Sequence, residues 1–383
     1  MRNRVLAALA TAIVLALWFG AVELTLRTFP ALLPQGGYGA GRFSTELGMN
    51  VHGGTAVYNK VRYTEHEANA DGFLDVDHTR ENPSGALRVG FFGDSYVEAM
   101  QVPLDQAFFR LLPPEIDGRP LEAFAFGRSG WGTVHSLLVW RLFGPRYGLD
   151  VVCYVFVEND PGDSSFVLEQ YWKRFNSPMP YADLSDQPPG FTLQWLTPPG
   201  NQSGAFKLVK FVQAHSRLVQ VTVNRLTLLR MGGARITPDA RAANMSGQAG
   251  AVPDSNDAPS TWPPEILTSV KELNVRLLRT WRDEVAAQGE RFFVLYVPRA
   301  QAQLTGEMKL EDTWRPWLGE VTAELGIPLL DPSAALAARL AAGDAVFDDH
   351  FSPAGHQVIA AEVARYLEGL ERAGAGARGA SGS

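Results

Sequence analysis

Ser95 stands in a context that suits nucleophilic attack on a carbonyl carbon. In this chain of 383 residues it follows the apolar run 87–92 (LRVGFF) through Gly93 and Asp94. We therefore expect Ser95 where a buried strand leaves a sheet, at the edge where ligands bind in open parallel sheets. Gly93 permits a tight turn there, and the backbone amides at the start of a following helix can stabilise negative charge. Taken alone, the same three residues also suit an ordinary turn or helix cap.

An Asp-Asp-His stretch near the C-terminus contains a candidate base. Ser352 and Pro353 are typical of a helix start, which leaves this stretch on the preceding loop. Residues two apart in an extended segment point the same way, so we expect Asp348 to face His350 and Asp349 to point away. A carboxylate that accepts from one imidazole nitrogen leaves the other nitrogen free as a base. A helix-capping loop with solvated acids is an equally good interpretation of this stretch alone.

Two further stretches supply hydrogen-bond donors at the ends of apolar runs. Gly130 follows the run 121–126, and Asn159 follows the run 151–157. Because the carboxyl ends of parallel strands meet at one edge of a sheet, we expect both near Ser95. A glycine amide and an asparagine side-chain amide are donor types that suit an oxyanion hole, although each is also common in turns.

In their order along the chain, these four elements resemble the SGNH hydrolases, also called the GDSL esterase and lipase family. The resemblance covers about residues 87–157 and 292–370. It implies a serine esterase with an α/β fold, a three-layer α/β/α sandwich whose parallel sheet resembles that of flavodoxin. It implies neither a metal nor a cofactor. The residues it implies are Ser95, Asp348 and His350 as the catalytic triad, and Ser95, Gly130 and Asn159 as the oxyanion hole.

The chain departs from the family pattern in two blocks. Many members carry Gly-x-Asn-Asp in the third block, whereas Val157 and Glu158 precede Asn159 here. Many members also space the last block as Asp-x-x-His, which would place Phe347 at the acid position. The Asp-x-His form of other members fits instead and selects Asp348.

Several other residues could contact a substrate or a metal, but each also suits a purely structural role. Asp94 and Trp131 are candidate substrate contacts, although a half-buried loop position suits Trp131 better. A divalent metal held by the Asp-Asp-His stretch and His356 is disfavoured, because no second histidine has suitable spacing on a helix face. Cys153, the only cysteine, lies within a strand-like run and is expected to be a small buried hydrophobe.

Strands and helices must position these side chains. The strand-like apolar runs are 87–92, 121–126, 151–157, 292–297 and 327–330, and helical patterns cover 262–288 and 352 to about 370. Their alternation predicts a parallel sheet with helices on both faces. Residues 161–261 interrupt it as an insertion. There, a basic amphipathic helix at 206–231 would pack on the sheet domain or rest on a membrane, followed by a disordered stretch at 232–260.

An uncharged run at 5–22 predicts a membrane-spanning helix about 27 Å long. Arg2 and Arg4 precede it, which favours a cytoplasmic N-terminus and a single-pass anchor in the inner membrane, with the catalytic domain on the periplasmic or extracytoplasmic side. A cleaved signal peptide is the alternative. The expected organisation is an anchor at 1–29, a flexible tether (30–41) and connecting segment at 30–86, the hydrolase domain at 87–160 and 262–372, the insertion at 161–261, and a disordered tail at 373–383.

The composition of the chain limits the classes of molecule that it is expected to bind. The net charge is −7 and there is no long run of Lys or Arg, so a nucleic-acid partner is disfavoured. The function expected is hydrolysis of small-molecule or polysaccharide esters, such as acyl groups on envelope or exported polysaccharide, with lipid esters nearly as suitable. An O-acyltransferase would use the same residues. A non-catalytic envelope scaffold or binding module is the alternative of another class.

Overall fold

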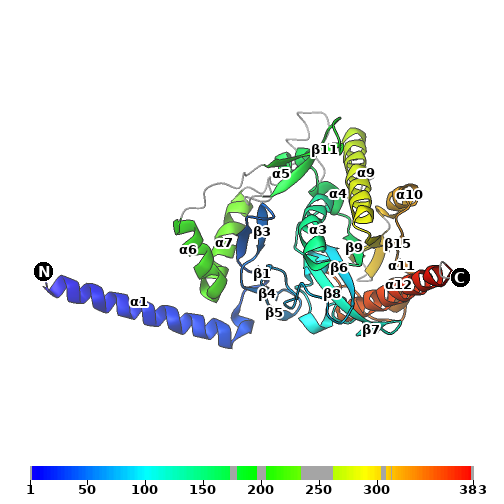
Figure 1. Ribbon diagram of the computed structural model, residues 1–383. Helices are drawn as coiled ribbons and strands as arrows, with labels where there is room; N and C mark the ends of the chain where they lie inside the picture. The colour runs from blue at the N-terminus through cyan, green and yellow to red at the C-terminus, as the bar shows by residue number, and fades with distance from the viewer. Residues whose placement is uncertain are drawn as a thin grey trace.

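The computed structural model describes residues 2–172, 179–195, 204–233, 262–302, 308–311 and 313–380. Its centre is a sheet with the strand order β15-β12-β9-β6-β8-β7 (Figure 1). Five strands run parallel, and they are β6 (Leu87–Gly93), β8 (Arg119–Gly127), β9 (Val151–Phe156), β12 (Arg291–Tyr296) and β15 (Leu329–Leu330). The short β7 (Glu115–Ile116) pairs antiparallel with β8. All five predicted strands are confirmed.

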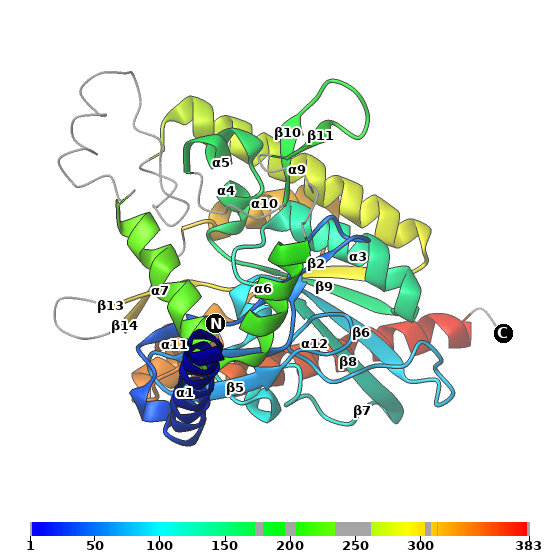
Figure 2. The ribbon, with the colours of Figure 1, turned by 90° about the vertical axis from the view of Figure 1, so that its left-hand side faces the viewer.

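Both faces of the sheet are apolar and covered by helices. On one face Phe92 and Tyr154 pack with α3 (Thr133–Tyr147), α9 (Pro264–Ala287) and α10 (Arg315–Leu325). On the other face Phe91 and Cys153 pack with α11 (Ser333–Ala341) and α12 (Pro353–Ala380). Figure 2 shows α3 and α9 on one side of the sheet and α12 on the other. The fold is therefore the predicted α/β/α arrangement, and Cys153 is buried as expected.

The carboxyl ends of β6, β8 and β9 meet at one edge of the sheet. Gly93 at the end of β6 pairs with Gly127 at the end of β8. The helix α2 (Ser95–Glu98) follows β6 and lies directly against the end of β8. A Cβ atom on Gly127 would stand 2.3 Å from the backbone nitrogen of Glu98, so only glycine permits this approach.

Residues 30–67 form two small antiparallel sheets where the sequence predicts a flexible tether and a connecting segment. A short 3-10 turn, η1 (Pro30–Leu32), leads into them. One sheet has the order β1-β4-β5, and the other joins β2 (Gly41–Ser44) and β3 (Met49–His52). The strands of the first are β1 (Gly36–Tyr38), β4 (Thr55–Asn59) and β5 (Tyr63–Glu67). Tyr38 and Val57 pack together with Leu33, so strand pairing and a local apolar cluster order a stretch whose proline and glycine content favours a loop.

The N-terminal helix α1 (Arg2–Thr28) projects away from the rest of the chain (Figure 1). Its most apolar 18-residue window has a mean hydropathy of 2.4 and no buried residues. Helix α1 is therefore long and apolar enough to cross a membrane, and a signal sequence would share these properties.

The predicted insertion divides into two parts. Its first part, α4 (Asp160–Asp163), α5 (Phe166–Trp172), β10 (Pro180–Leu184) and β11 (Phe191–Trp195), packs against α3 and α9 as a group. In the second part, two helices replace the single helix predicted at 206–231. They are α6 (Gly204–His215) and α7 (Arg217–Gly233), and they contact the N-terminal strands β2 and β1. The break falls at Ser216, whose hydroxyl accepts a hydrogen bond from the Val219 amide (3.2 Å) and caps α7.

Two predictions concern segments that are partly or wholly outside the described residues. The predicted disordered stretch at 232–260 lies outside them from residue 234 onward. The predicted tail at 373–383 instead continues α12 as far as Ala380. Residues 373–380 contain four alanines, which favour a helix, and three glycines, which disfavour it, so composition alone does not predict where the helix ends. A last hairpin joins β13 (Arg299–Ala302) and β14 (Met308–Glu311).

Candidate active site

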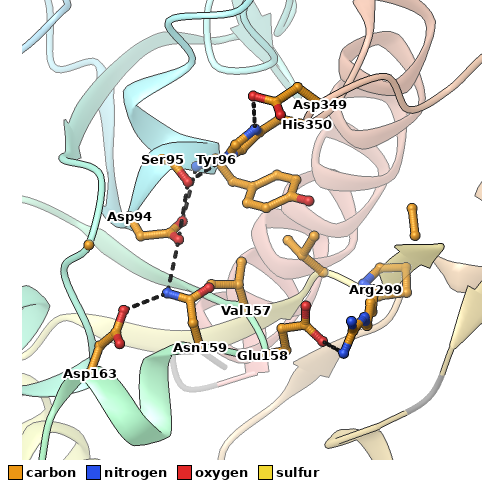
Figure 3. Close-up of a pocket in the computed structure, with 14 residues that line it drawn as sticks. Asp94, Ser95, Tyr96, Val157, Glu158, Asn159, Asp163, Arg299, Asp349 and His350 are labelled. Atoms are coloured by element: carbon orange, nitrogen blue, oxygen red, sulfur yellow. Dashed lines mark hydrogen bonds and ion pairs between the residues drawn. The ribbon is translucent and has the colours of Figure 1, made fainter. Parts of the chain in front are cut away.

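Ser95 lies at the first position of α2, directly after β6 (Figure 3). The Asp94 side chain caps this helix by accepting a hydrogen bond from the Tyr96 amide (3.0 Å). Ser95 Oγ is 2.6 Å from Nε2 of His350, although the two residues are 255 positions apart. The Tyr96 ring packs against the His350 imidazole with a centroid separation of 4.7 Å. The structure therefore brings the predicted nucleophile and base into hydrogen-bond contact.

Asp349 lies beside the histidine, where the sequence predicts Asp348. Asp349 Oδ2 is 3.4 Å from His350 Nδ1, whereas Asp348 Oδ2 is 2.6 Å from a guanidinium nitrogen of Arg62. The stretch is turned rather than extended, because the Asp348 amide donates to the His350 carbonyl (2.9 Å). In such a turn residues two apart need not share a face, so the expectation that Asp349 points away is wrong.

Strand β4 and the turn that follows it hold Asp349 in place. The Lys60 ammonium lies 2.9 Å from Asp349 Oδ2, and the Tyr58 hydroxyl donates to the same oxygen over 3.2 Å. The His350 imidazole, whose Nδ1 is 3.4 Å away, lowers the pKa of the Asp349 carboxyl below its usual range, with Lys60 assisting and partial burial opposing. This carboxyl is therefore ionised at neutral pH.

A second group of acids surrounds the predicted oxyanion donor Asn159. Its side-chain amide donates to Asp163 Oδ2 (2.9 Å) and to Asp94 Oδ2 (3.4 Å). The Asp94 carboxyl is buried, and burial raises its pKa to about 6 although the hydrogen bonds from Tyr96 and Asn159 lower it. Asn159 is thus beside Ser95, with its amide directed at two carboxylates.

The loop that carries Gly130 is tied to a buried glutamate. Glu98 Oε2 accepts from the Ser129 amide (3.1 Å) and from the Ser129 hydroxyl, and Glu98 Oε1 lies 2.6 Å from Nε2 of His52. Burial raises the pKa of Glu98. The hydrogen bond from His52 and the charges of His52 and Arg128 outweigh this effect and lower the pKa to about 2. Gly130 follows with a φ of +79°, a left-handed conformation that favours glycine.

These residues line a cavity of about 330 Å³ with a strongly polar wall. Its acidic and basic side chains are Asp94, Glu158, Asp163, Arg299, Asp349 and His350. Arg299 and Glu158 face each other with 3.4 Å between their nearest polar atoms. The other lining residues are Ser95, Tyr96, Gly130, Val157, Asn159, Val297, Pro298 and Ala300.

The remaining candidates lie elsewhere. Trp131 is only 1% exposed, packs edge-on against Phe73 and does not line the cavity, so this structure does not place it at a substrate. His356 is buried and its Nδ1 accepts from the Phe108 amide (3.1 Å). Within the described part of the chain, no three His, Cys, Asp or Glu side chains are grouped so as to hold a metal ion.

Two residues of the site, Arg299 and Lys60, were not predicted from the sequence. Arg299 follows β12 at the same sheet edge as the other candidates, so the rule applied to Ser95, Gly130 and Asn159 would also have found it. Lys60 stands at the end of β4 with no local pattern that signals chemistry. Only the three-dimensional packing of the N-terminal sheet brings it to Asp349.

No protein-family model and no curated protein matches the chain. Among solved structures, it is similar to TesA, with a TM-score of 0.37 and 10% identity over 74% of this chain and 99% of that one. A GDSL-like lipase from Bacteroides thetaiotaomicron has a TM-score of 0.35 and 9% identity over 76% of this chain and 93% of the lipase. A protein described as an acylhydrolase from Bacteroides fragilis has a TM-score of 0.36 and 10% identity, over 74% and 88% of the two chains. At this level of similarity we base the function on the site's own geometry.

Proposed function

We propose that this protein is a serine esterase in which Ser95 attacks the ester carbonyl. The observation that carries the proposal is the 2.6 Å contact between Ser95 Oγ and His350 Nε2 at the wall of a cavity. His350 takes the Ser95 proton at Nε2 as the C–O bond of the tetrahedral intermediate forms. It then returns the proton to the leaving alcohol, and water regenerates the free serine from the acyl-enzyme.

For the third member of the triad we propose Asp349 in place of Asp348. An ionised carboxylate 3.4 Å from Nδ1 stabilises the imidazolium that forms when His350 takes the proton. Asp348 is engaged by Arg62 and serves to hold the loop. The Ser95 and Gly130 amides and the Asn159 side chain are the proposed oxyanion donors, and Asn159 must exchange its hydrogen bond with Asp94 for one to the substrate oxygen.

We further propose that the acyl group is short and that the alcohol is polar. The cavity is small and lined mainly by charged or polar groups. A long alkyl chain would displace water from these groups and offer no hydrogen bond in return, which is unfavourable. An acetyl group on a carbohydrate fits this chemistry. Helix α1 would keep such an enzyme at the inner membrane, with its catalytic domain on the periplasmic side.

The test is ester hydrolysis by the full-length chain in detergent, with p-nitrophenyl acetate, p-nitrophenyl octanoate and an acetylated xylan as substrates. We expect a higher kcat/KM for the acetyl than for the octanoyl ester. Ser95→Ala should abolish turnover, and Ser84→Ala, a change at an exposed loop serine, should leave it unchanged. Full activity in Ser95→Ala would contradict the proposed nucleophile. A sugar acceptor that diverts the acyl group from water would instead identify an O-acyltransferase.

A further inference from the structure

An apolar stripe on α6 is exposed near the end of α1. Leu208, Phe211 and Val212 are three and four residues apart and therefore lie on one face of the helix. Their exposed fractions are 62%, 63% and 37%. We call these three residues the α6 face. Contiguous large apolar side chains at the surface of a folded protein usually mark a contact with a partner or a membrane.

Polar contacts fix the junction of α6 and α7 to α1. The Glu23 carboxylate accepts hydrogen bonds from the Ser216 hydroxyl (2.9 Å) and from the Arg217 and Leu218 amides (2.9 and 3.0 Å). Arg27 donates to the carbonyl oxygen of His215, the last residue of α6, over 2.6 Å. The junction therefore lies at the level of Glu23 on α1.

Apolar packing reinforces this connection. Leu26 of α1 and Val221 of α7 pack on the cluster formed by Leu33, Tyr38 of β1 and Val57 of β4. These contacts fix α7 to α1, and α6 in turn packs against α7 and β2. The position of α6 relative to α1 is consequently a defined feature of the fold.

This position suits the surface of a bilayer. Glu23 is the first charged residue after the uncharged run 5–22, so it marks where α1 would leave the hydrocarbon core. Figures 1 and 2 both show α6 running across the direction of α1 rather than along it. A helix that crosses a membrane-spanning helix at this level lies parallel to the membrane surface.

We propose that the α6 face lies in the boundary between headgroups and acyl chains of the same bilayer that α1 spans. Helix α6 is then an interfacial helix, and a lipid surface is its partner. Together with the packed end of α1, it holds the folded domain in one orientation on the membrane. The proposal depends on α1 being in a bilayer and is independent of the proposed ester hydrolysis.

The test measures the depth of labels in the full-length chain reconstituted into phosphatidylcholine vesicles. Cys153 is the only cysteine and is fully buried, so Phe211→Cys and Leu208→Cys can each be labelled selectively with bimane. The matched control is Val167→Cys, which is 43% exposed on α5, in a part of the molecule distant from α1 (Figure 1). Leu17→Cys on α1 reports whether that helix is in the bilayer.

We expect brominated phosphatidylcholine to quench the labels at 208 and 211 at least about threefold more than the label at 167, and aqueous iodide to show the reverse order. Equal iodide quenching at 211 and 167, without an effect of bromolipid, would overturn the proposal. Protection of 211 from both quenchers would also overturn it, and would indicate a protein partner or a second copy of the chain. If bromolipid does not quench Leu17→Cys, α1 is not in the bilayer and the proposal fails with it.

Discussion

Replacing Asp349 by Asn tests which carboxylate supports the proposed catalytic histidine. At 3.4 Å and an effective dielectric constant of about 20, the Asp349 charge stabilises an imidazolium by about 5 kcal/mol. Solvent screening reduces this value because the side chain is 30% exposed. The Lys60 ammonium, 2.9 Å from the same oxygen, reduces it further. We therefore expect Asp349→Asn to raise the activation barrier by about 3 kcal/mol and to lower kcat about 100-fold.

Asp348→Asn is the matched control, because it makes the same change at the neighbouring residue. Its carboxylate accepts a hydrogen bond from Arg62, and an asparagine side chain keeps an oxygen that can accept the same bond. We expect kcat to fall less than about threefold, since the contact between His350 and Asp349 remains.

The assay is steady-state hydrolysis of p-nitrophenyl acetate by both variants at several pH values, with circular dichroism to confirm that each is folded. A large loss in Asp348→Asn with little change in Asp349→Asn would refute the assignment of Asp349. It would favour an extended loop in the active enzyme, in which Asp348 faces the histidine. Small losses in both variants would show that neither carboxylate supports the histidine.

Three more predictions concern groups around the site. Lys60→Met should lower kcat about 3- to 10-fold with little change in KM, because losing the cation that positions Asp349 outweighs removing its competing charge. Lys60→Arg should restore most of kcat, and an unchanged kcat in Lys60→Met would contradict this. Glu98→Gln should destabilise the fold by about 2 kcal/mol at pH 7, since it removes the buried charged acceptor of the His52 and Ser129 hydrogen bonds. It should also lower kcat by misplacing the Gly130 loop, and urea unfolding and kinetics measure the two effects. The pKa of Asp94 rises from 3.8 to about 6 on folding, so its contribution to stability should fall by up to about 3 kcal/mol as pH rises from 4 to 6. Asp94→Asn should remove this pH dependence in urea unfolding at pH 4 and 7, and an unaltered dependence would contradict it.

The sheet and the gathering of Ser95, Gly130 and Asn159 near its edge were predictable from the sequence because their signals are local. Buried parallel strands read as continuous apolar runs, and in parallel sheets the residues that follow such runs gather at one edge. The chain follows both rules at β6, β8 and β9. His350 follows no strand of the sheet, so its pairing with Ser95, 255 positions away, was expected from the order of the motifs and the resemblance they carry.

Features that depend on tertiary contacts were not predictable in this way. The turn between the bridged residues Phe347 and Phe351 replaces the extended segment that would place Asp348 on the histidine. Pairing of β1 with β4 orders a stretch that composition alone assigns to a tether. The Glu23 carboxylate caps α7 by accepting hydrogen bonds from residues nearly 200 positions away, and no local sequence pattern predicts this contact.

The most direct test of the central claim is intact-mass measurement of the full-length chain in detergent before and after treatment with a fluorophosphonate. An activated Ser95 predicts one covalent adduct per chain, absent in Ser95→Ala, slowed in His350→Ala and retained in Ser84→Ala. An adduct that persists in Ser95→Ala would assign the reactivity to another residue. A folded parent chain that forms no adduct would contradict an accessible, activated serine and favour a non-catalytic binding protein.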